Sequence, residues 1–419
     1  MSKNNQLLDY QDQINLLRKL IELHPIYGAG SQKESIDIIE EILLQNSWND
    51  IYRDVFKSKE LINDKGYVSI KDFSEEFKND TELEKINLIS ILDSGFDGPT
   101  VILNGHYDVD IVSNPHLWEH RDGWKKANII DNKLYGRGSS DMLAGLTSML
   151  YVANSFTKKQ KQWGGRIIFC AVTDEELGGN GSLHALKVLA KKGYLNNPDD
   201  CFVIIAEPSD NIIGTESLGF IHFKIVIKGK SVHMGVANQK DNAIYKTYEI
   251  IENFKTIITH ATESFGNTAK QSIKYNFGII NGGKDAAIPI GEISLEGAIF
   301  HPEDISIDKL KVNLRHEINK FNSDALIDFS DFGFSGFKSS QNKLSRILLD
   351  TRVSGDIKEG LFPSPCDARL FNLYGISNVV VYGPGSLSQA HSENEYITLE
   401  SIKSYNEHLE KALDILLAK

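Results

Sequence analysis

Histidines and acidic residues in this chain follow short apolar runs, at the positions where the strands of a parallel sheet would end. His106 comes directly after the run VILNG, and Asp108 stands two residues further on. Side chains two residues apart in an extended segment point to the same side. A histidine and a carboxylate placed in this way suit a metal ligand and the group that orients it. His391 follows another apolar run, VVVYGPG and a short polar stretch.

Four further acidic residues belong to the same series. Asp141 lies in GRGSSDMLAGL, where the glycines permit a tight turn and an expected helix start supports a carboxylate. Glu175 and Glu176 follow RIIFCAVTD, and neighbouring residues point in different directions, so one can bind metal while the other takes a proton from water. Glu207 ends the run CFVIIAE. Acids in such apolar surroundings are costly unless they are paired or bind metal, so the series predicts a metal site with an adjacent base.

The elements that carry these residues have the rhythm of an α/β sheet. Helical periodicity covers residues 7–24, 32–46, 141–156 and 181–191, and apolar, β-branched runs cover 86–93, 99–104, 165–172 and 201–206. Alternating strands and helices are typical of a sheet with crossover helices, and such a sheet binds ligands at the carboxyl ends of its strands. The pattern therefore predicts one site built from several strand ends.

After Pro208 the pattern changes. The stretch IHFKIVIKGK predicts a strand, residues 242–258 a helix, SIKYNFGIING and EISLEGAIF two strands, and residues 304–319 a helix. This block predicts a small inserted α+β domain that ends within residues 323–340. The α/β pattern then resumes with a helix over 342–353, a strand over 377–382 and a helix over 399–417. We expect a catalytic domain from 1–212 and 329–419, with 213–328 inserted.

Composition limits the function classes. The chain has 419 residues, 41% of them hydrophobic, and a formal net charge of −12, which argues against a nucleic-acid partner. No signal peptide and no apolar run of about 18 residues is visible, so no membrane partner is expected. Cys170, Cys201 and Cys366 are odd in number and widely spaced, as expected for thiols in a reducing compartment. We expect a cytoplasmic protein.

Seven stretches together resemble a known family. They are GHYDVD, GRGSSDMLAG, TDEELGGNG, AEPSD, GKSVHMG, SPCDAR and GPGSLSQAHSENEYI, in the family's order over nearly the whole chain. The chain resembles the zinc metallopeptidase family of acetylornithine deacetylase, succinyl-diaminopimelate desuccinylase, aminoacylase and glutamate carboxypeptidase. The resemblance implies a zinc-exopeptidase-like α/β catalytic domain, with a mixed, mainly parallel sheet between helices. It also implies an inserted, βαββαβ-like α+β domain that acts as lid and dimerisation domain.

The resemblance also implies a ligand set for two zinc ions per subunit. His106 and Glu207 would be the terminal ligands of one ion, and Glu176 and His391 those of the other. Asp141 would bridge the two ions. Nitrogen and oxygen ligands suit zinc and also admit cobalt or manganese. Two such ions can activate a water and polarise a scissile carbonyl.

The remaining roles come from the resemblance as well. Glu175 would be the general base, and Asp108 would orient His106. His233, in GKSVHMG, would stabilise the oxyanion and contact the substrate from the small domain. In dimeric members this histidine reaches the partner's site, so a homodimer through the small domain is expected. Arg369, in SPCDAR, would hold the substrate carboxylate, and an ion pair with Asp367 is the alternative.

Two departures concern the substrate side of the small domain. The family usually has an asparagine three residues before the proline of GGKDAAIP, where this chain has Ala286. It usually has an arginine in the following strand, which here reads LEGAIFHPE. The metal chemistry is expected to remain intact. The standard small acyl-amino-acid substrates are put in doubt, unless a neighbour compensates.

These observations predict a dinuclear zinc hydrolase that cleaves an amide bond adjacent to a free carboxylate. The first expectation is an N-acyl-amino-acid deacylase similar to acetylornithine deacetylase. The alternative is a metallo-carboxypeptidase or dipeptidase with the same site. A non-catalytic relative that binds metal and a carboxylate ligand is the third reading, and the complete set of ligands and base argues against it. The expected partners are a small N-acyl amino acid or short peptide and a second copy of the chain.

Overall fold

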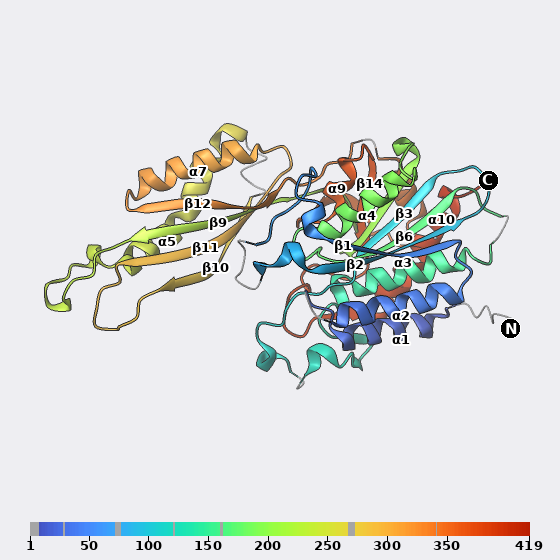
Figure 1. Ribbon diagram of the computed structural model, residues 1–419, viewed down its shortest axis with the longest axis horizontal. Coiled ribbons are helices and arrows are strands. Elements are labelled where there is room, and N and C mark those ends of the chain that lie inside the picture. Colours follow the sequence, from blue (N-terminus) through green and yellow to red (C-terminus); the bar gives the residue numbers. More distant parts are fainter. Residues whose placement is uncertain are drawn as a thin grey trace.

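The described part of the chain forms two lobes, each built around its own β-sheet (Figure 1). The computed structural model describes residues 8–27, 30–71, 77–119, 122–159, 162–266, 273–340 and 342–419. The larger lobe, called the main lobe below, carries both ends of the chain (Figure 1). The smaller lobe, called the lid below, is formed by the segment from β9 to β12 and projects away from the large sheet.

The large sheet is mixed, with parallel strands at its centre. Its strands lie in the order β1-β2-β6-β3-β7-β14-β8-β13. The pairs β6–β3, β3–β7 and β7–β14 are parallel, so their carboxyl ends open at one edge. These central strands are apolar along almost their whole length because helices cover both faces. The bounds are β1 Asp50–Lys57, β2 Glu84–Asp93, β3 Thr100–His106, β6 Arg166–Val172, β7 Cys201–Pro208, β8 Ile212–Ser217, β13 Lys358–Phe362 and β14 Asn378–Gly383.

Helices pack on both faces of this sheet and bury its apolar side chains. One face carries α1 Tyr10–Leu23, α2 Ser31–Gln45, α3 Ala144–Ser155, α8 Lys343–Thr351 and α10 Leu399–Leu416. The other face carries α4 Asn180–Lys191 and α9 Ala368–Asn372. Short elements complete the lobe: the strands β4 Ile129–Ile130, β5 Lys133–Tyr135 and β15 Tyr396–Thr398, and single turns at Ser58–Glu60, Asp80–Glu82, Pro115–Leu117, Gly123–Lys125, Ser139–Leu143 and Pro198–Asp200.

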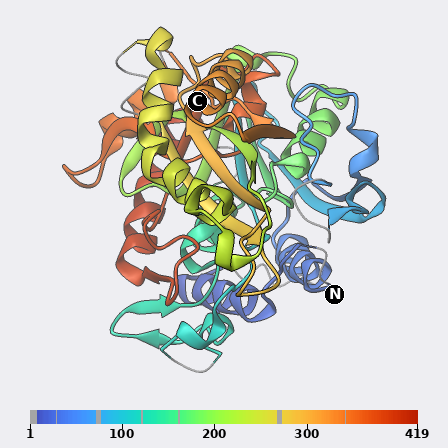
Figure 2. The same ribbon diagram turned by 90° about the vertical axis from the view of Figure 1, so that its left-hand side faces the viewer.

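The lid has the chain order βαββαβ and an antiparallel sheet with the strand order β10-β11-β9-β12. Both of its long helices cover one face of that sheet, as Figures 1 and 2 show. Along β11, buried residues alternate with half-buried ones, so one face forms the lid core and the other stays more open. The bounds are β9 Gly219–Lys228, α5 Ala243–Ala261, β10 Lys274–Gly282, β11 Glu292–His301, α7 Ile307–Phe321 and β12 Ala325–Phe334, with single turns at Met234–Val236, Gln239–Asp241 and Glu263–Phe265.

The predicted fold class is confirmed, with some shifts in the element bounds. The expected lid limits, residues 213 and 328, fall inside β8 and β12. The chain joins the large sheet once more as β8 before it enters the lid, and the last lid strand runs on to Phe334. The helix expected from residue 141 begins at Ala144, because Asp141 itself has extended backbone angles.

The three cysteines, Cys170, Cys201 and Cys366, are buried and form no disulfide with one another. Among the described residues, no helix combines the length and the apolar character needed to cross a bilayer.

Candidate active site

The predicted ligands meet at the edge of the large sheet where its parallel strands end. His106 is the last residue of β3, Glu207 is the next-to-last of β7, and Glu176 lies in the turn after β6. His391 lies in the loop after β14, and Asp141 lies in the turn before α3. These residues are far apart in sequence, and the parallel strand order brings them together.

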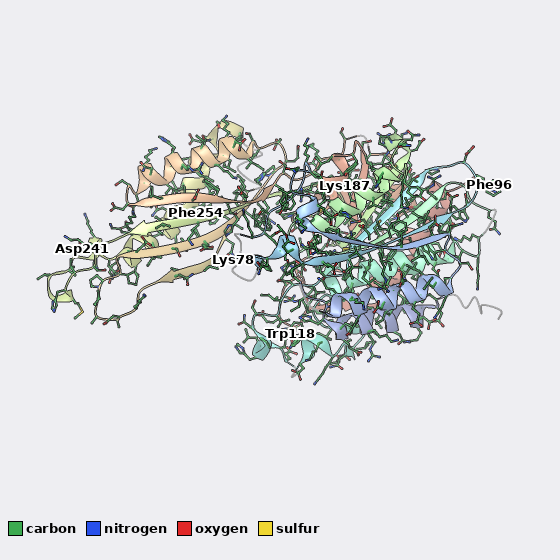
Figure 3. All side chains as sticks on the ribbon, in the orientation of Figure 1. Lys78, Phe96, Trp118, Lys187, Asp241 and Phe254 are labelled. Carbon is green, nitrogen blue, oxygen red and sulfur yellow. The ribbon has the colours of Figure 1, made fainter. Side chains whose placement is uncertain are left out.

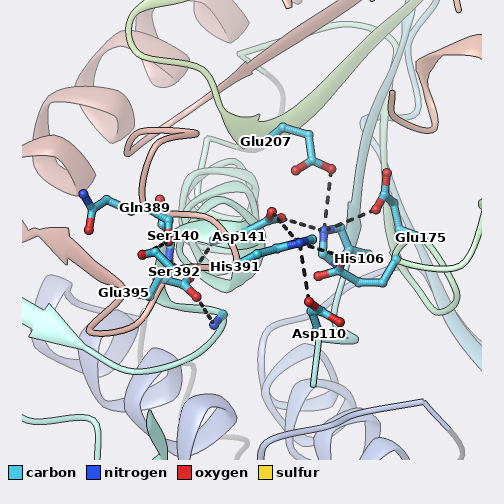
Figure 4. A network of polar contacts seen from close by, with 12 residues as sticks. His106, Asp110, Ser140, Asp141, Glu175, Glu207, Gln389, His391, Ser392 and Glu395 are labelled. Carbon is cyan, nitrogen blue, oxygen red and sulfur yellow. Dashed lines mark hydrogen bonds and ion pairs between the residues drawn. The ribbon is translucent and has the colours of Figure 1, made fainter. Parts of the chain in front are cut away.

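Asp141 stands between two groups of candidate ligands (Figure 4). Its Oδ1 lies 3.2 Å from His106 Nε2, which is 3.6 Å from Glu207 Oε1. Its Oδ2 lies 3.5 Å from His391 Nε2, which is 3.0 Å from Glu176 Oε2. In each group of three, the ligand atoms lie within 4.8 Å of one another. The two oxygens of one carboxylate therefore face two separate groups of candidate ligands, which is the arrangement that a bridging ligand would need.

Asp108 contacts one candidate ligand of each group, His106 through its backbone carbonyl and Glu176 through its carboxylate. His106 Nδ1 donates to the backbone carbonyl of Asp108 over 2.8 Å, whereas the nearest carboxylate oxygen of Asp108 is 3.7 Å away. The carboxylate accepts the backbone N–H of Glu176 over 3.3 Å. Nδ1 is therefore protonated, which leaves Nε2 as the nitrogen that can bind a cation.

Two acidic residues near the ligands were not predicted. Glu395 is fully buried and accepts the backbone N–H groups of Ser140 over 2.8 Å and of Asp141 over 3.1 Å. It also pairs with Arg137 over 2.8 Å and so fixes the turn that carries Asp141. Asp110 Oδ2 lies 3.4 Å from His391 Nδ1. A signal for Asp110 existed, because GHYDVD continues its alternation of acids by two residues.

The crowding of carboxylates shifts their pKa values. Burial raises the pKa of Glu207 to about 7. Burial and the nearby Glu207 raise the pKa of Glu175 well above its usual range. Burial opposes ionisation of Asp141 too, but hydrogen bonds to His106 and His391 hold its pKa below its usual range. A bound divalent cation would favour the ionised form of each group.

Two buried carboxylate oxygens without hydrogen-bond partners in the described part of the chain also indicate that this site suits a bound cation. Glu176 Oε1 and Glu207 Oε1 are buried and have no hydrogen-bond partner among the described residues. A buried carboxylate oxygen without a partner is costly. Two histidine nitrogens and three carboxylates form a donor set that suits zinc. The residues therefore fit a pair of divalent cations.

Arg369 is largely buried, with 8% of its surface exposed. Its guanidinium donates to the carbonyls of Gly178 over 2.6 Å and of Gly66 over 3.3 Å. It also stacks on Phe334, with the guanidinium carbon 4.1 Å from the ring centre. Burial lowers its pKa to about 10. Between described residues it forms no salt bridge with Asp367, which instead accepts a hydrogen bond from Ser182 over 2.5 Å.

His233 lies away from the candidate metal ligands of its own chain. It is exposed and follows β9, in the connection that leads to α5. Figure 3 labels Asp241 of the same connection at the end of the lid farthest from the main lobe. The His233 side chain accepts the backbone N–H of Gly235 over 3.1 Å. The structure thus does not bring His233 to the site that the other predicted residues form.

A cleft of about 620 Å³ lies between the site and the open face of the lid sheet. Its walls include Glu175, Glu176 and His391 on the side of the main lobe. Residues of all four lid strands form the opposite wall. Both lobes would therefore contact a small molecule bound beside the ligands.

Comparison with known proteins decides the family. The sequence matches the model of peptidase family M20/M25/M40 over residues 102–414. The chain belongs to this family. As an M20-type peptidase it is a hydrolase of amide or peptide bonds, and membership implies a divalent metal.

Relatives of this M20-type chain cover most of its length. A Staphylococcus aureus protein named "Probable succinyl-diaminopimelate desuccinylase" is 26% identical over 414 residues, covering 90% of this chain and 95% of the relative. A dipeptidase from Saccharomyces cerevisiae superposes with a TM-score of 0.71 at 16% identity, over 99% of both chains. An M20 family metallo-carboxypeptidase from Sulfolobus solfataricus gives a TM-score of 0.69 at 15% identity, over 97% and 99%. The solved structures show that the fold is shared.

Proposed function

We propose that this chain is a dinuclear zinc hydrolase that cleaves the amide bond of a small N-acyl amino acid beside its free carboxylate. The observation that carries the proposal is the shared position of Asp141 between the group of His106 and Glu207 and the group of Glu176 and His391. Two bound zinc ions would polarise the scissile carbonyl and activate the attacking water, and cobalt or manganese are alternative metals.

Glu175 is our candidate for the general base. It belongs to neither ligand group, yet its Oε2 lies 4.0 Å from His106 Nε2 and it lines the cleft. A carboxylate at this position can take a proton from water and pass it to the leaving amine. Asp108 would fix the ring of His106 through its backbone carbonyl, and Arg369 is our candidate anchor for the substrate carboxylate. Its two backbone bonds use two of the five N–H groups of a guanidinium.

The same site can serve a second substrate class. A dipeptide or the end of a short peptide also presents an amide bond close to a free carboxylate. The similarity to proteins named desuccinylase, dipeptidase and metallo-carboxypeptidase supports both classes. Deacylation is our first proposal and dipeptidase or carboxypeptidase activity the alternative. Parallel assays with N-acyl amino acids and dipeptides, scored for free amine, distinguish them.

We also propose a homodimer formed through the lid. Strand β10 is an edge strand, and its Ile280 is 58% exposed. On α5, Ile244, Tyr248 and Ile251 are spaced along one helix face and are 47%, 60% and 39% exposed. An apolar helix face beside an open strand edge is suited to a two-fold contact. In such a dimer, His233 of one chain would act at the site of the other. Buried free thiols support a cytoplasmic location.

Glutamine substitutions test the assignment of the two adjacent glutamates. Glu175→Gln should keep about two zinc ions per chain and lose roughly 10²–10⁴ in turnover, because it removes the base alone. Glu176→Gln should lose zinc as well, because it removes a ligand charge. Glu393→Gln, at an exposed position of the loop that carries His391, is the matched control and should retain metal and turnover. A metal-depleted Glu175→Gln protein with a metal-replete Glu176→Gln protein would reverse the assignment.

A further inference from the structure

The wall of the cleft that belongs to the lid carries a cluster of aromatic side chains. Phe220, Phe300, Phe332 and Phe334 all line the cleft that also exposes Glu175. The ring centre of Phe220 lies 5.0 Å from that of Phe332, 5.8 Å from that of Phe300 and 5.9 Å from that of Phe334. Rings at these separations attract one another, so this aromatic wall is preformed.

Strand register explains why the rings face the cleft. Phe300 on β11 stands opposite Phe220 on β9, and both are half-buried residues of the open face. Their neighbours in sequence, Ile299 and Ile221, are fully buried in the lid core. The alternation of a strand thus directs the isoleucines to the helices and the phenylalanines to the cleft.

The aromatic wall reaches the turn that carries Glu176. Phe332 packs in one buried cluster with Leu177, which directly follows Glu176, and Phe220 and Phe334 lie against the same cluster. A substrate whose scissile bond lies beside Glu175 and Glu176 would therefore extend one substituent over the rings. Covering an apolar surface that the fold leaves half open is favourable.

Charged groups near this wall are already engaged or lie at its rim. Lys224 and Glu296, on the same open face, pair with each other over 2.8 Å. Lys274 is exposed, stands opposite Phe300 on the edge strand β10, and donates to the carbonyl of Pro363 over 3.4 Å. Between these groups the wall offers the rings, the small side chain of Ala298 and, opposite Ala298, His222. His222 in turn contacts Ser330 over 3.1 Å and Glu296 over 3.7 Å.

We infer that the substrate carries a bulky apolar group on the lid side of its scissile bond, such as a medium-chain or aromatic acyl group or an apolar amino-acid side chain. This inference rests on the proposed function and adds the chemical class of the substrate. A short, anionic acyl group is disfavoured, because it would lose hydration against the rings, while the nearby cations Lys274 and Arg369 already donate to backbone carbonyls.

Two matched substrate series test the inference with the zinc-loaded protein. One series fixes the amino acid and varies the acyl group from acetyl to hexanoyl, benzoyl and succinyl. The other fixes the acetyl group and varies the side chain from methyl to benzyl. Each methylene that is fully buried raises kcat/KM about fourfold, so the four extra methylenes of hexanoyl would give about 250-fold if all were fully buried. The aromatic wall covers the acyl chain from one side only, so roughly 10- to 100-fold is expected. We expect kcat/KM to rise by that factor with apolar size in at least one series.

Variants of Phe300 connect that preference to the aromatic wall. The ratio of kcat/KM between the large and small apolar substrates should fall from wild type to Phe300→Leu and again to Phe300→Ala. Phe321→Ala, at a 42% exposed site on α7, is the control and should keep the wild-type ratio. Thermal melting of each variant verifies folding.

Three results would overturn the inference: flat kcat/KM in both series, a preference for succinyl over hexanoyl, or an unchanged ratio in folded Phe300→Ala. No turnover of any compound would instead contradict the proposed function. Calorimetry would then still test the inference, by comparing the affinities of the hexanoyl and succinyl compounds for the zinc-loaded protein. Tighter binding of the hexanoyl compound would support it, and tighter binding of the succinyl compound would overturn it.

Discussion

Lys85 offers a sharp test of how the fold holds the turn that carries Glu175 and Glu176. Its side chain is 3% exposed and pairs with Asp80 over 2.5 Å and with Asp174, both 1% exposed. Asp174 directly precedes Glu175, has a positive φ of 64°, and its carbonyl accepts the N–H of Gly179 over 2.7 Å. Lys85 therefore anchors the first residue of the turn. We predict that Lys85→Met weakens both stability and metal binding.

The magnitude follows from burial. Lys85→Met keeps most of the side-chain volume but leaves two buried carboxylates without their cation, and breaking a buried pair in this way costs about 3–5 kcal/mol. With an m-value of about 3 kcal/mol/M, the urea midpoint should fall by about 1–1.7 M. Lys187 pairs with Asp64 over 2.7 Å, but the two side chains are 45% and 35% exposed. Lys187→Met should therefore cost at most about 1 kcal/mol.

Urea unfolding followed by tryptophan fluorescence, together with zinc content and kcat, measures these effects. Lys85→Met should show the lower midpoint, less than the wild-type zinc content and a reduced kcat. Lys85→Arg keeps the charge and should recover part of each loss. A Lys85→Met protein with a wild-type midpoint and full zinc content would refute the reasoning that this buried cluster holds the turn of Glu175 and Glu176.

The other predictions concern the dimer and Arg369. In a dimer with His233 acting on the partner's site, mixing inactive Glu175→Ala and His233→Ala proteins under subunit exchange should restore about a quarter of wild-type activity, since half of the dimers are mixed and each has one intact site. A mixture that stays inactive would place His233 outside the partner's site. Arg369→Lys should lower kcat/KM for substrates with a free carboxylate and have little effect on amide-capped analogues. Equal losses on both, measured side by side, would instead assign Arg369 to holding Gly178 in place.

The sequence predicted the central fold because its signals are local. The runs that became β3, β6 and β7 are buried on both faces and read as continuous apolar segments. Strands β1 and β13 were missed because each lies at an edge of the sheet and mixes exposed charged residues with apolar ones. The lid strand β12 was not predicted as a strand, and its residues were assigned only to the segment that leaves the lid. Its alternation of buried and exposed residues is irregular, so it gives no clear strand signal.

The site was predictable as far as its residues sit in recognisable motifs. His106, Glu175 and Glu207 each stand at or just after the end of an apolar run, so their meeting at one edge of the sheet could be inferred from position. Glu395 could not be inferred, because its role depends on N–H groups some 255 residues earlier in the chain. The role of Lys85 could not be inferred either, because its partner Asp174 lies 89 residues away in the chain. Long-range pairs of single residues leave no periodic signal in one sequence.

Zinc titration of the metal-free protein tests the central claim most directly. Metal is removed with a chelator, zinc is added in known equivalents, and bound zinc and amide hydrolysis are measured on the same samples. With Asp141 shared between two ligand groups, we predict that activity reaches its maximum at about two bound zinc ions per chain. Full activity in the metal-free protein, or maximal activity at one bound zinc ion per chain, would contradict the account.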